Sequence, residues 1–140
     1  MKSVKRKNSK SVKLKAKKVK PPMQNLKTDL KKRTYIFALD VIKFIDELQK
    51  DRTCDVISKQ LLRSASSIGA NIIEVQASSS KKDFANFFNI ALKSANETKF
   101  WLGLLRDSGK ADRGKVNKLL DEVIQISNIL GRSLITIREK

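Results

Sequence analysis

The fold of this chain is decided by residues 60–109, which read QLLRSASSIGANIIEVQASSSKKDFANFFNIALKSANETKFWLGLLRDSG. Apolar residues recur at steps of three and four on each side of the serine run 78–80, which is the spacing of two amphipathic helices. Ser80 with Asp83 three residues later fits a capping box, and Gly109 fits the C-terminal cap of the same helix. The stretch therefore predicts two antiparallel helices joined by a serine-rich turn.

Helical patterns also flank this stretch on both sides. One begins near Thr28 and ends at a polar break at residues 50–53, after which the next helix begins near residues 53–55. The last, opened by Asp112, repeats apolar residues at alternating steps of four and three, as in helix bundles. Short connections favour antiparallel neighbours, so we expect an all-α, antiparallel up-down-up-down four-helix bundle over residues 29–140. The small residues expected to let the central helix pair approach closely are Gly69, Ala70, Ala91 and Ala95.

Positive charge is concentrated at the N-terminus. The chain of 140 residues has 31 Lys and Arg against 14 Asp and Glu, a net charge of +17. Residues 1–33 hold 14 of these cations and one acid, which leaves +4 for the rest. Because like charges repel and little apolar surface is available to bury, residues 1–28 are predicted to be a disordered Lys-rich tail. This tail is interpreted either as a solubilising segment or as a nucleic-acid-binding arm, with contacts from Lys5, Arg6, Lys7, Lys10, Lys13, Lys15, Lys17, Lys18 and Lys20.

The composition argues against an enzyme. The chain has no histidine, the usual general base and metal ligand, and the single cysteine, Cys54, has no base to activate it. Glu74 and Glu97 form only a weak carboxylate pair without a metal-binding motif. We therefore expect no catalytic residue, no metal and no cofactor. One cysteine, no apolar run of membrane-spanning length and no signal-peptide pattern favour a cytoplasmic protein without membrane association.

A polar pattern follows the two central helices beside their apolar stripes. Spacings of three and four residues place its members along one line on each helix. One interpretation is structural, in which these groups hydrogen-bond across the helices and set their register. The other is a surface for a ligand or partner, and spacing alone does not separate the two. The stripe consists of Arg63, Ser67, Asn71, Glu74, Ser94 and Glu97.

The segments RSASSIGANIIE (residues 63–74) and DFANFFNIALKSANETKFWLGLLRDSG (residues 83–109) resemble a known family. It is the small bacterial four-helix bundle family first noticed in intervening sequences of large-subunit ribosomal RNA genes, and its fold is related to the accessory protein of diversity-generating retroelements. The resemblance covers about residues 30–138. Many members have glycine where this chain has Val75, so we expect the helix to continue another turn there. The matching residues are Arg63, Ser64, Ser67, Ile68, Asn71, Ile72, Glu74, Phe84, Phe88, Ala91, Ser94, Glu97 and Leu105.

The resemblance implies a homo-oligomeric bundle, with pentamers known in the family, and no established enzyme activity. Nucleic-acid interaction is the role usually suggested for such proteins. The sequence supports assembly independently, because large apolar residues lie off the core stripes and contiguous apolar patches mark interfaces. The alternative is that they are ordinary scattered surface residues. The candidate interface residues are Ile36, Leu39, Ile90, Phe100, Trp101 and Leu104.

Two functions remain open at this point. The first is a non-enzymatic oligomer that associates with the RNA or DNA backbone through its basic surface and tail. The second is a protein-interaction scaffold, or an accessory subunit of a reverse transcriptase or another nucleic-acid enzyme. An enzyme is the least favoured class, because no general base or nucleophile stands out in the sequence.

Overall fold

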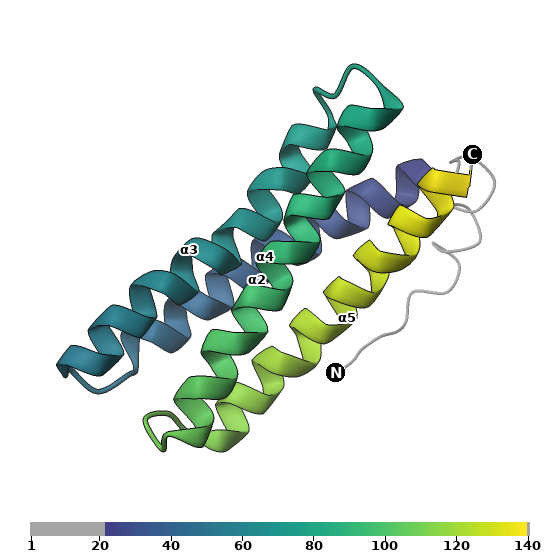
Figure 1. The fold of residues 1–140 in the computed structure, drawn as a ribbon. Helices are drawn as coiled ribbons and strands as arrows, with labels where there is room; N and C mark the ends of the chain where they lie inside the picture. Colours follow the sequence, from purple (N-terminus) through teal and green to yellow (C-terminus); the bar gives the residue numbers. More distant parts are fainter. Residues whose placement is uncertain (1–21, 140) are drawn as a thin grey trace.

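The structure, a computed structural model, describes residues 22–139, with side chains from residue 29 onward, and shows four helices in this part of the chain (Figure 1). They are α2 (Pro22–Asp46), α3 (Arg52–Val75), α4 (Lys81–Asp107) and α5 (Arg113–Glu139). Residues 22–139 contain no strand. The predicted all-α class is confirmed.

Each helix packs against the helices before and after it, and α5 also contacts α2. The backbones of the diagonal pairs, α2 with α4 and α3 with α5, do not come close to each other, so the four helices form a ring around one core. In Figure 1 the turns after α2 and α4 lie at the same end of the bundle and the turn after α3 lies at the other. The up-down-up-down topology is thus confirmed.

Side-chain caps define where three of the helices begin. The Ser80 hydroxyl accepts a hydrogen bond from the Asp83 amide at 3.0 Å, as the capping box predicted. The Asp112 carboxylate accepts one from the Lys115 amide at 2.9 Å at the start of α5. After α4 the chain reverses at Gly109, whose φ of 76° is the left-handed conformation that glycine adopts without strain.

The structure corrects three predicted helix boundaries. Helix α2 begins at Pro22 rather than near Thr28, because the fixed φ of proline suits a first helical position, where no amide partner is lost. Helix α3 begins at Arg52, since Asp51 caps it through the Cys54 amide. It ends at Val75 without the extra turn expected there, and the backbone continues in tighter i→i−3 bonds through residue 78.

The core contains the apolar stripes of all four helices, and Leu61, Phe88 and Leu130 are fully buried at its centre. Two small residues do not act as predicted. Gly69 faces α2 instead of α4, and a Cβ at this position would lie 3.2 Å from the Thr34 Oγ1 atom. Glycine therefore permits the close approach of α3 to α2, while Ala70 is exposed.

The contact between α2 and α5 is the smallest of the four helix contacts, and ion pairs bridge it. The Arg33 guanidinium donates two hydrogen bonds to the Glu122 carboxylate, at 2.8 and 2.9 Å. Near the other end, Lys115 donates to Glu47 at 2.8 Å. Because the Arg33 pair is only about one-third exposed and has two-point geometry, it orients the two helices better than a fully solvated pair would.

Asp51 joins the two turns at one end of the bundle. Its carboxylate accepts hydrogen bonds from the Cys54 amide at 2.8 Å, from the Gln49 side chain, and from Lys110 at 3.0 Å in the turn after α4. These donors, led by the Cys54 amide, hold the pKa of Asp51 well below its usual value, and the carboxylate in turn raises the pKa of Lys110. The ionised carboxylate therefore holds the two turns together.

This arrangement predicts how stability depends on pH. Because the folded pKa of Asp51 is depressed, its contribution is complete above the unfolded value of about 3.9 and is lost as pH falls below it. Asp51→Asn should lower the urea midpoint by a constant amount between pH 7 and about pH 5, and the gap from wild type should shrink below about pH 4. Asp121→Asn on exposed α5 surface is the control and should show no such gap. A difference in urea midpoint between wild type and Asp51→Asn that stays constant down to pH 3 would contradict the role assigned to the carboxylate.

Candidate interaction surfaces

The polar stripe of α3 faces α4, and its centre is a cluster of hydroxyl and amide groups. Ser94 on α4 donates a hydrogen bond to the Ser67 hydroxyl across the helix pair, at 2.9 Å. The Asn71 amide donates to the Ser67 carbonyl at 2.8 Å and to its hydroxyl at 3.1 Å. The Ser67 hydroxyl thus accepts from both Ser94 and Asn71, and Asn71 also bonds to the backbone of its own helix, as a register-setting contact requires.

One turn away, Glu97 bridges the two helices at the surface. Its carboxylate accepts a hydrogen bond from Arg63 on α3 and another from the indole nitrogen of Trp101, at 3.1 Å, on its own helix. The Arg63 side chain is more than half exposed, so solvent screens this pair, which serves geometry more than stability. Glu74, the last member of the stripe, is exposed and forms no ion pair with any described residue.

A pair of buried hydroxyl groups between α3 and α4 was not predicted from the sequence. Thr98 donates to the Ser94 carbonyl at 2.8 Å, and its hydroxyl oxygen lies 2.9 Å from that of Ser64 on α3. Both side chains are completely buried, whereas Ser67 and Glu97 are only half-buried. The burial of Ser64 could have been predicted from its spacing, since Ser64 follows Leu61 by three residues and precedes Ile68 by four, on the buried face of α3.

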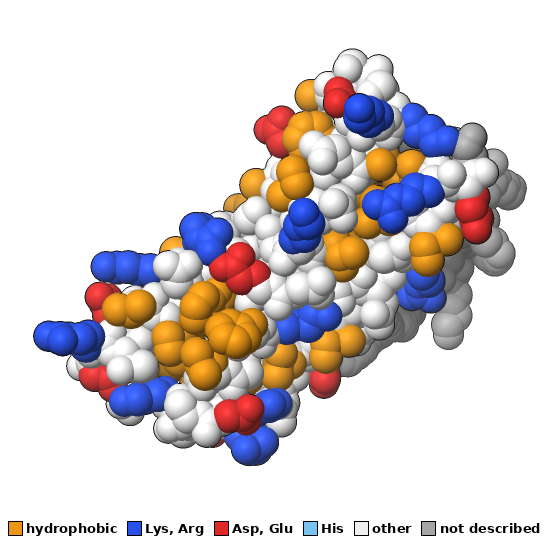
Figure 2. All heavy atoms as spheres, viewed as in Figure 1, with side chains coloured by type: hydrophobic (Ala, Val, Ile, Leu, Met, Phe, Trp, Pro, Cys, Tyr) orange, Lys and Arg blue, Asp and Glu red, His pale blue; other side chains and the backbone are white. Residues whose placement is uncertain are grey.

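The predicted interface residues fall into two separate groups. Ile36 and Leu39 are exposed on α2, whereas the other four lie on α4, and these helices do not contact each other. On α4, Phe100 is 59% exposed and packs edge-to-face on the half-buried Trp101, with ring centres 5.0 Å apart. Figure 2 shows apolar side chains gathered over the lower part of α3 and α4, bordered by charged groups. The two remaining α4 residues, Ile90 and Leu104, are also exposed.

Other exposed apolar side chains were not predicted from the sequence. Val56 on α3 is more than half exposed and lies on the side of that helix that faces α4. Tyr35, Ile42 and Ile73 are exposed on the opposite side, where α2 meets α3. Residues separated by three, four or seven positions share one helix face, so the apolar flanks could have been found by tracing a second line on each helix.

The described residues offer little for covalent or metal chemistry. Cys54 is buried, and burial raises the pKa of its thiol, as does the nearby Asp51. Residues 22–139 contain no group of three or more carboxylate, cysteine or histidine side chains placed to hold a metal ion. No helix in this range is long and apolar enough to cross a membrane. The predicted nucleic-acid contacts, Lys5 to Lys20, lie outside the described residues.

The fold and the motif can be compared with known proteins. The model of the 23S rRNA-intervening sequence protein family matches residues 27–132, which is most of the chain and all of the polar stripe. The chain belongs to this family. A crystal structure of a protein of unknown function from the S23 ribosomal protein family of Bacteroides thetaiotaomicron superposes with a TM-score of 0.73 at 35% sequence identity. The alignment covers 78% of this chain and 97% of that one. Among curated proteins, none matches this chain.

Membership of the 23S rRNA-intervening sequence protein family accounts for the fold. The predicted resemblance is confirmed, and the alignment with the similar structure covers nearly the whole length of that other chain. Neither the family description nor the name of the similar structure assigns an enzymatic reaction. The family does not define the ligand, so the role of the chain has to be argued from its own charges and surfaces.

The buried contact between Ser64 and Thr98 predicts a non-additive stability effect. Removing one hydroxyl, in Ser64→Ala or Thr98→Val, leaves the other buried with fewer partners and should cost about 1–3 kcal/mol. The double variant should lower the free energy of unfolding by less than the sum of the two single changes, because no hydroxyl is then left without its partner. Urea unfolding of the four proteins measures this coupling. Ser66→Ala on the exposed face of α3 is the control, and strict additivity at Ser64 and Thr98 would contradict the inferred contact.

Proposed function

We propose that this protein is a non-enzymatic homo-oligomer that associates with nucleic-acid backbones through its basic N-terminal segment and surface, in the cytoplasm. The charge distribution carries the proposal, because residues 1–20 contain ten cations and no acid. Lys and Arg neutralise phosphates and release condensed counterions, which gives affinity without reading base sequence. An oligomer of this chain carries a net charge of +17 for every copy it contains.

The bundle itself contributes less to this binding. Its net charge from residue 34 onward is only +4, and several of its cations already pair with carboxylates. Arg33 binds Glu122, Lys110 binds Asp51, and Arg63 binds Glu97, so these groups are not free to neutralise phosphate without losing a partner. The weight of the proposal therefore rests on the N-terminal segment.

The non-enzymatic part of the proposal rests on the state of the few reactive groups. The chain has no histidine, and Cys54 is a buried thiol with a raised pKa, whereas a nucleophilic cysteine needs a lowered one. Of the two carboxylates considered as a pair, Glu97 is engaged by Arg63 and Trp101. Among residues 22–139, neither carboxylate belongs to a group of three or more carboxylate, cysteine or histidine side chains placed to hold a metal ion.

RNA binding across a salt series tests the nucleic-acid proposal. If half of the ten cations in residues 1–20 bind phosphates, the slope of log K against log salt should be roughly −4, at about −0.7 to −0.9 for each phosphate. Replacing these ten cations with glutamine should remove most of that slope. Fluorescence anisotropy with a labelled 20-nucleotide RNA measures both quantities.

Two controls make the result decisive. A chain with the order of residues 1–20 shuffled keeps the charge and should keep the affinity, because counterion release depends on charge and not on order. Lys81→Gln with Lys82→Gln, on exposed α4 surface, should reduce the slope only slightly. If the glutamine variant binds RNA as tightly as wild type, with the same slope, the N-terminal segment does not bind nucleic acid.

The apolar surfaces support the oligomeric part of the proposal. Phe100 and Leu104 on α4, and Ile36 and Leu39 on α2, lie on helices that do not touch. A contact between two different patches is heterologous, and repeated heterologous contacts close into rings when the rotation permits. A ring such as the pentamer implied by the family resemblance would use both patches on every copy.

Phe100→Glu tests assembly without disturbing the core, because this side chain is 59% exposed. We expect wild type to have a mass several times the 15.9 kDa of one chain, and the variant to have a reduced mass with unchanged helical circular dichroism. Ile135→Glu on α5, a similarly exposed position outside the predicted interface, should leave the mass unchanged. A wild-type monomer in light scattering at micromolar concentration would rule out the oligomer.

A second candidate is an accessory subunit of a reverse transcriptase or another nucleic-acid enzyme. The exposed apolar side chains on α2, α3 and α4 favour it, since a partner protein would also cover them. In this case the enzyme partner should bind the glutamine variant of residues 1–20 as well as it binds wild type. A reverse transcriptase gene beside that of this chain would favour the accessory role.

A further inference from the structure

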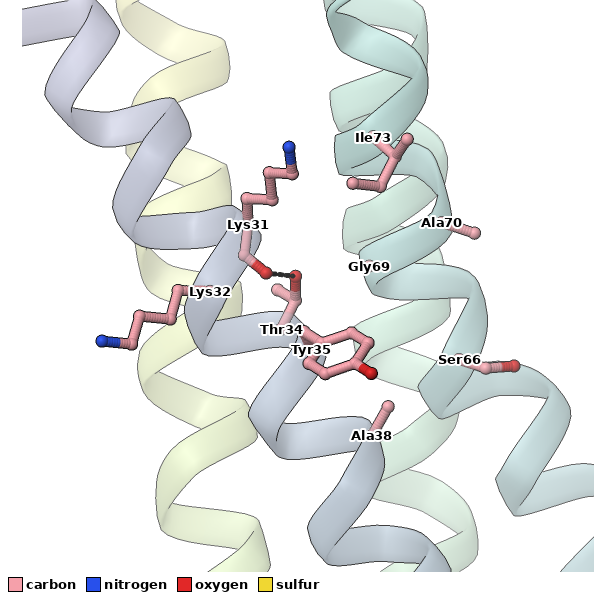
Figure 3. Close-up of a pocket in the computed structure, with 9 residues that line it drawn as sticks. All are labelled: Lys31, Lys32, Thr34, Tyr35, Ala38, Ser66, Gly69, Ala70 and Ile73. Carbon is pink, nitrogen blue, oxygen red and sulfur yellow. Dashed lines mark hydrogen bonds between the residues drawn. The ribbon is translucent and has the colours of Figure 1, made fainter.

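An apolar groove of about 680 Å³ lies between α2 and α3 on the outside of the bundle (Figure 3). It lies on the side of α3 opposite the polar stripe, and α4 contributes none of its lining. Its volume is within the usual range of ligand sites, although it is open along its length like a helix-binding groove. Neither the nucleic-acid proposal nor the predicted interface uses it.

Small residues form the floor of this groove. Thr34 turns its hydroxyl back onto the Leu30 carbonyl at 2.7 Å, and Gly69 lies against it with no side chain of its own. Ala38 and Ser66 continue the lining on the two helices. Because no long side chain fills the space between the helix axes, another helix can approach closely there.

Apolar side chains form the two walls of the groove. Tyr35 on α2 and Ile73 on α3 line it and are 66% and 45% exposed. The contact of Thr34 with Gly69 sets the antiparallel register, so Ile42 lies level with the exposed Leu62 beyond one end. From Lys31 to Ile42 the surface extends about 16 Å along α2, or three helical turns. Apolar side chains at i, i+4 and i+7 of a docked helix span about 10 Å, or two of these three turns.

The charges beside the groove indicate the chemistry of its occupant. Lys31 lies at the end of the groove level with Ile73, and neither Lys31 nor Lys32 forms an ion pair with any described residue. By contrast, Arg33 on the neighbouring face is held by Glu122. No carboxylate lines the groove. An occupant with carboxylates at one end therefore fits, whereas the chain's own Lys-rich N-terminal segment would be repelled.

We propose that the α2–α3 groove binds an acidic amphipathic helix of another protein, which packs apolar side chains between Tyr35 and Ile73 and presents carboxylates to Lys31. The apolar walls provide contact area, and the lysine orients the helix along the groove. This site is independent of nucleic-acid binding, so either proposal can fail without the other.

Two synthetic peptides test the proposal with the full-length chain. Both are fluorescein-labelled 14-residue helices with leucine at i, i+4 and i+7 and alanine or glutamine elsewhere, and they carry two glutamates or two lysines at one end. We expect the glutamate peptide to bind at least tenfold more tightly than the lysine peptide at 0.15 M salt, in anisotropy measurements. Lys31→Glu should reverse this preference. No measurable binding of either peptide at 1 mM would overturn the proposal.

Matched variants separate the groove from the overall charge and from general stickiness. Lys82→Glu on α4 changes the net charge as much as Lys31→Glu and should leave the preference intact. Tyr35→Ala should weaken binding of the glutamate peptide about tenfold. Phe100→Ala, at a similarly exposed aromatic residue on α4, should leave this binding unchanged. Equal losses in groove and control variants would overturn the site. An oligomer that dissociates on Tyr35→Ala or Lys31→Glu would instead identify the occupant as a second copy and overturn the proposal.

Discussion

The arrangement of this bundle depends on hydroxyl groups that are buried, or nearly so, between α3 and α4. Ser64 and Thr98 are completely buried, and a buried hydroxyl without a partner costs free energy comparable to a lost hydrogen bond. Only one register places Ser64 beside Thr98 and Ser67 beside Ser94. Sliding α4 by one turn in either direction would break both pairs and bring at most one new pair of these hydroxyls together. Apolar contacts hold the two helices together, and the hydroxyls determine how they are aligned.

This alignment determines what the surface presents. It brings Arg63 to Glu97, and Glu97 holds the Trp101 ring against which Phe100 packs. The same rotation of α3 turns Ser66 and Ile73 away from α4 and toward α2. The apolar patch on α4 and the groove between α2 and α3 thus lie on opposite sides of α3. The proposed assembly contact at Phe100 and the proposed partner groove therefore lie on different sides of the bundle.

Four of the six ion pairs among the described residues join different helices or turns. Arg33 binds Glu122 across the least-packed contact, and Asp51 connects the two turns at one end through Lys110. Such pairs orient helices, but they also consume the cations that could neutralise phosphate. The excess of positive charge is therefore densest in residues 1–20, which contain ten cations and no acid. Lys31 is unpaired beside a paired Arg33, which makes it available to an acidic partner.

The sequence alone determined the helix count, the topology and most of the core, because apolar periodicity and caps such as Ser80 act over a few residues. It placed the polar stripe on the correct helices, and family membership followed from the same residues. It could not distinguish the neighbour of each flank, because Gly69 was expected to face α4 but packs on α2. Nor did it find the Ser64–Thr98 contact or the groove at Tyr35. These depend on the rotation of each helix about its axis, which only packing against distant parts of the chain decides.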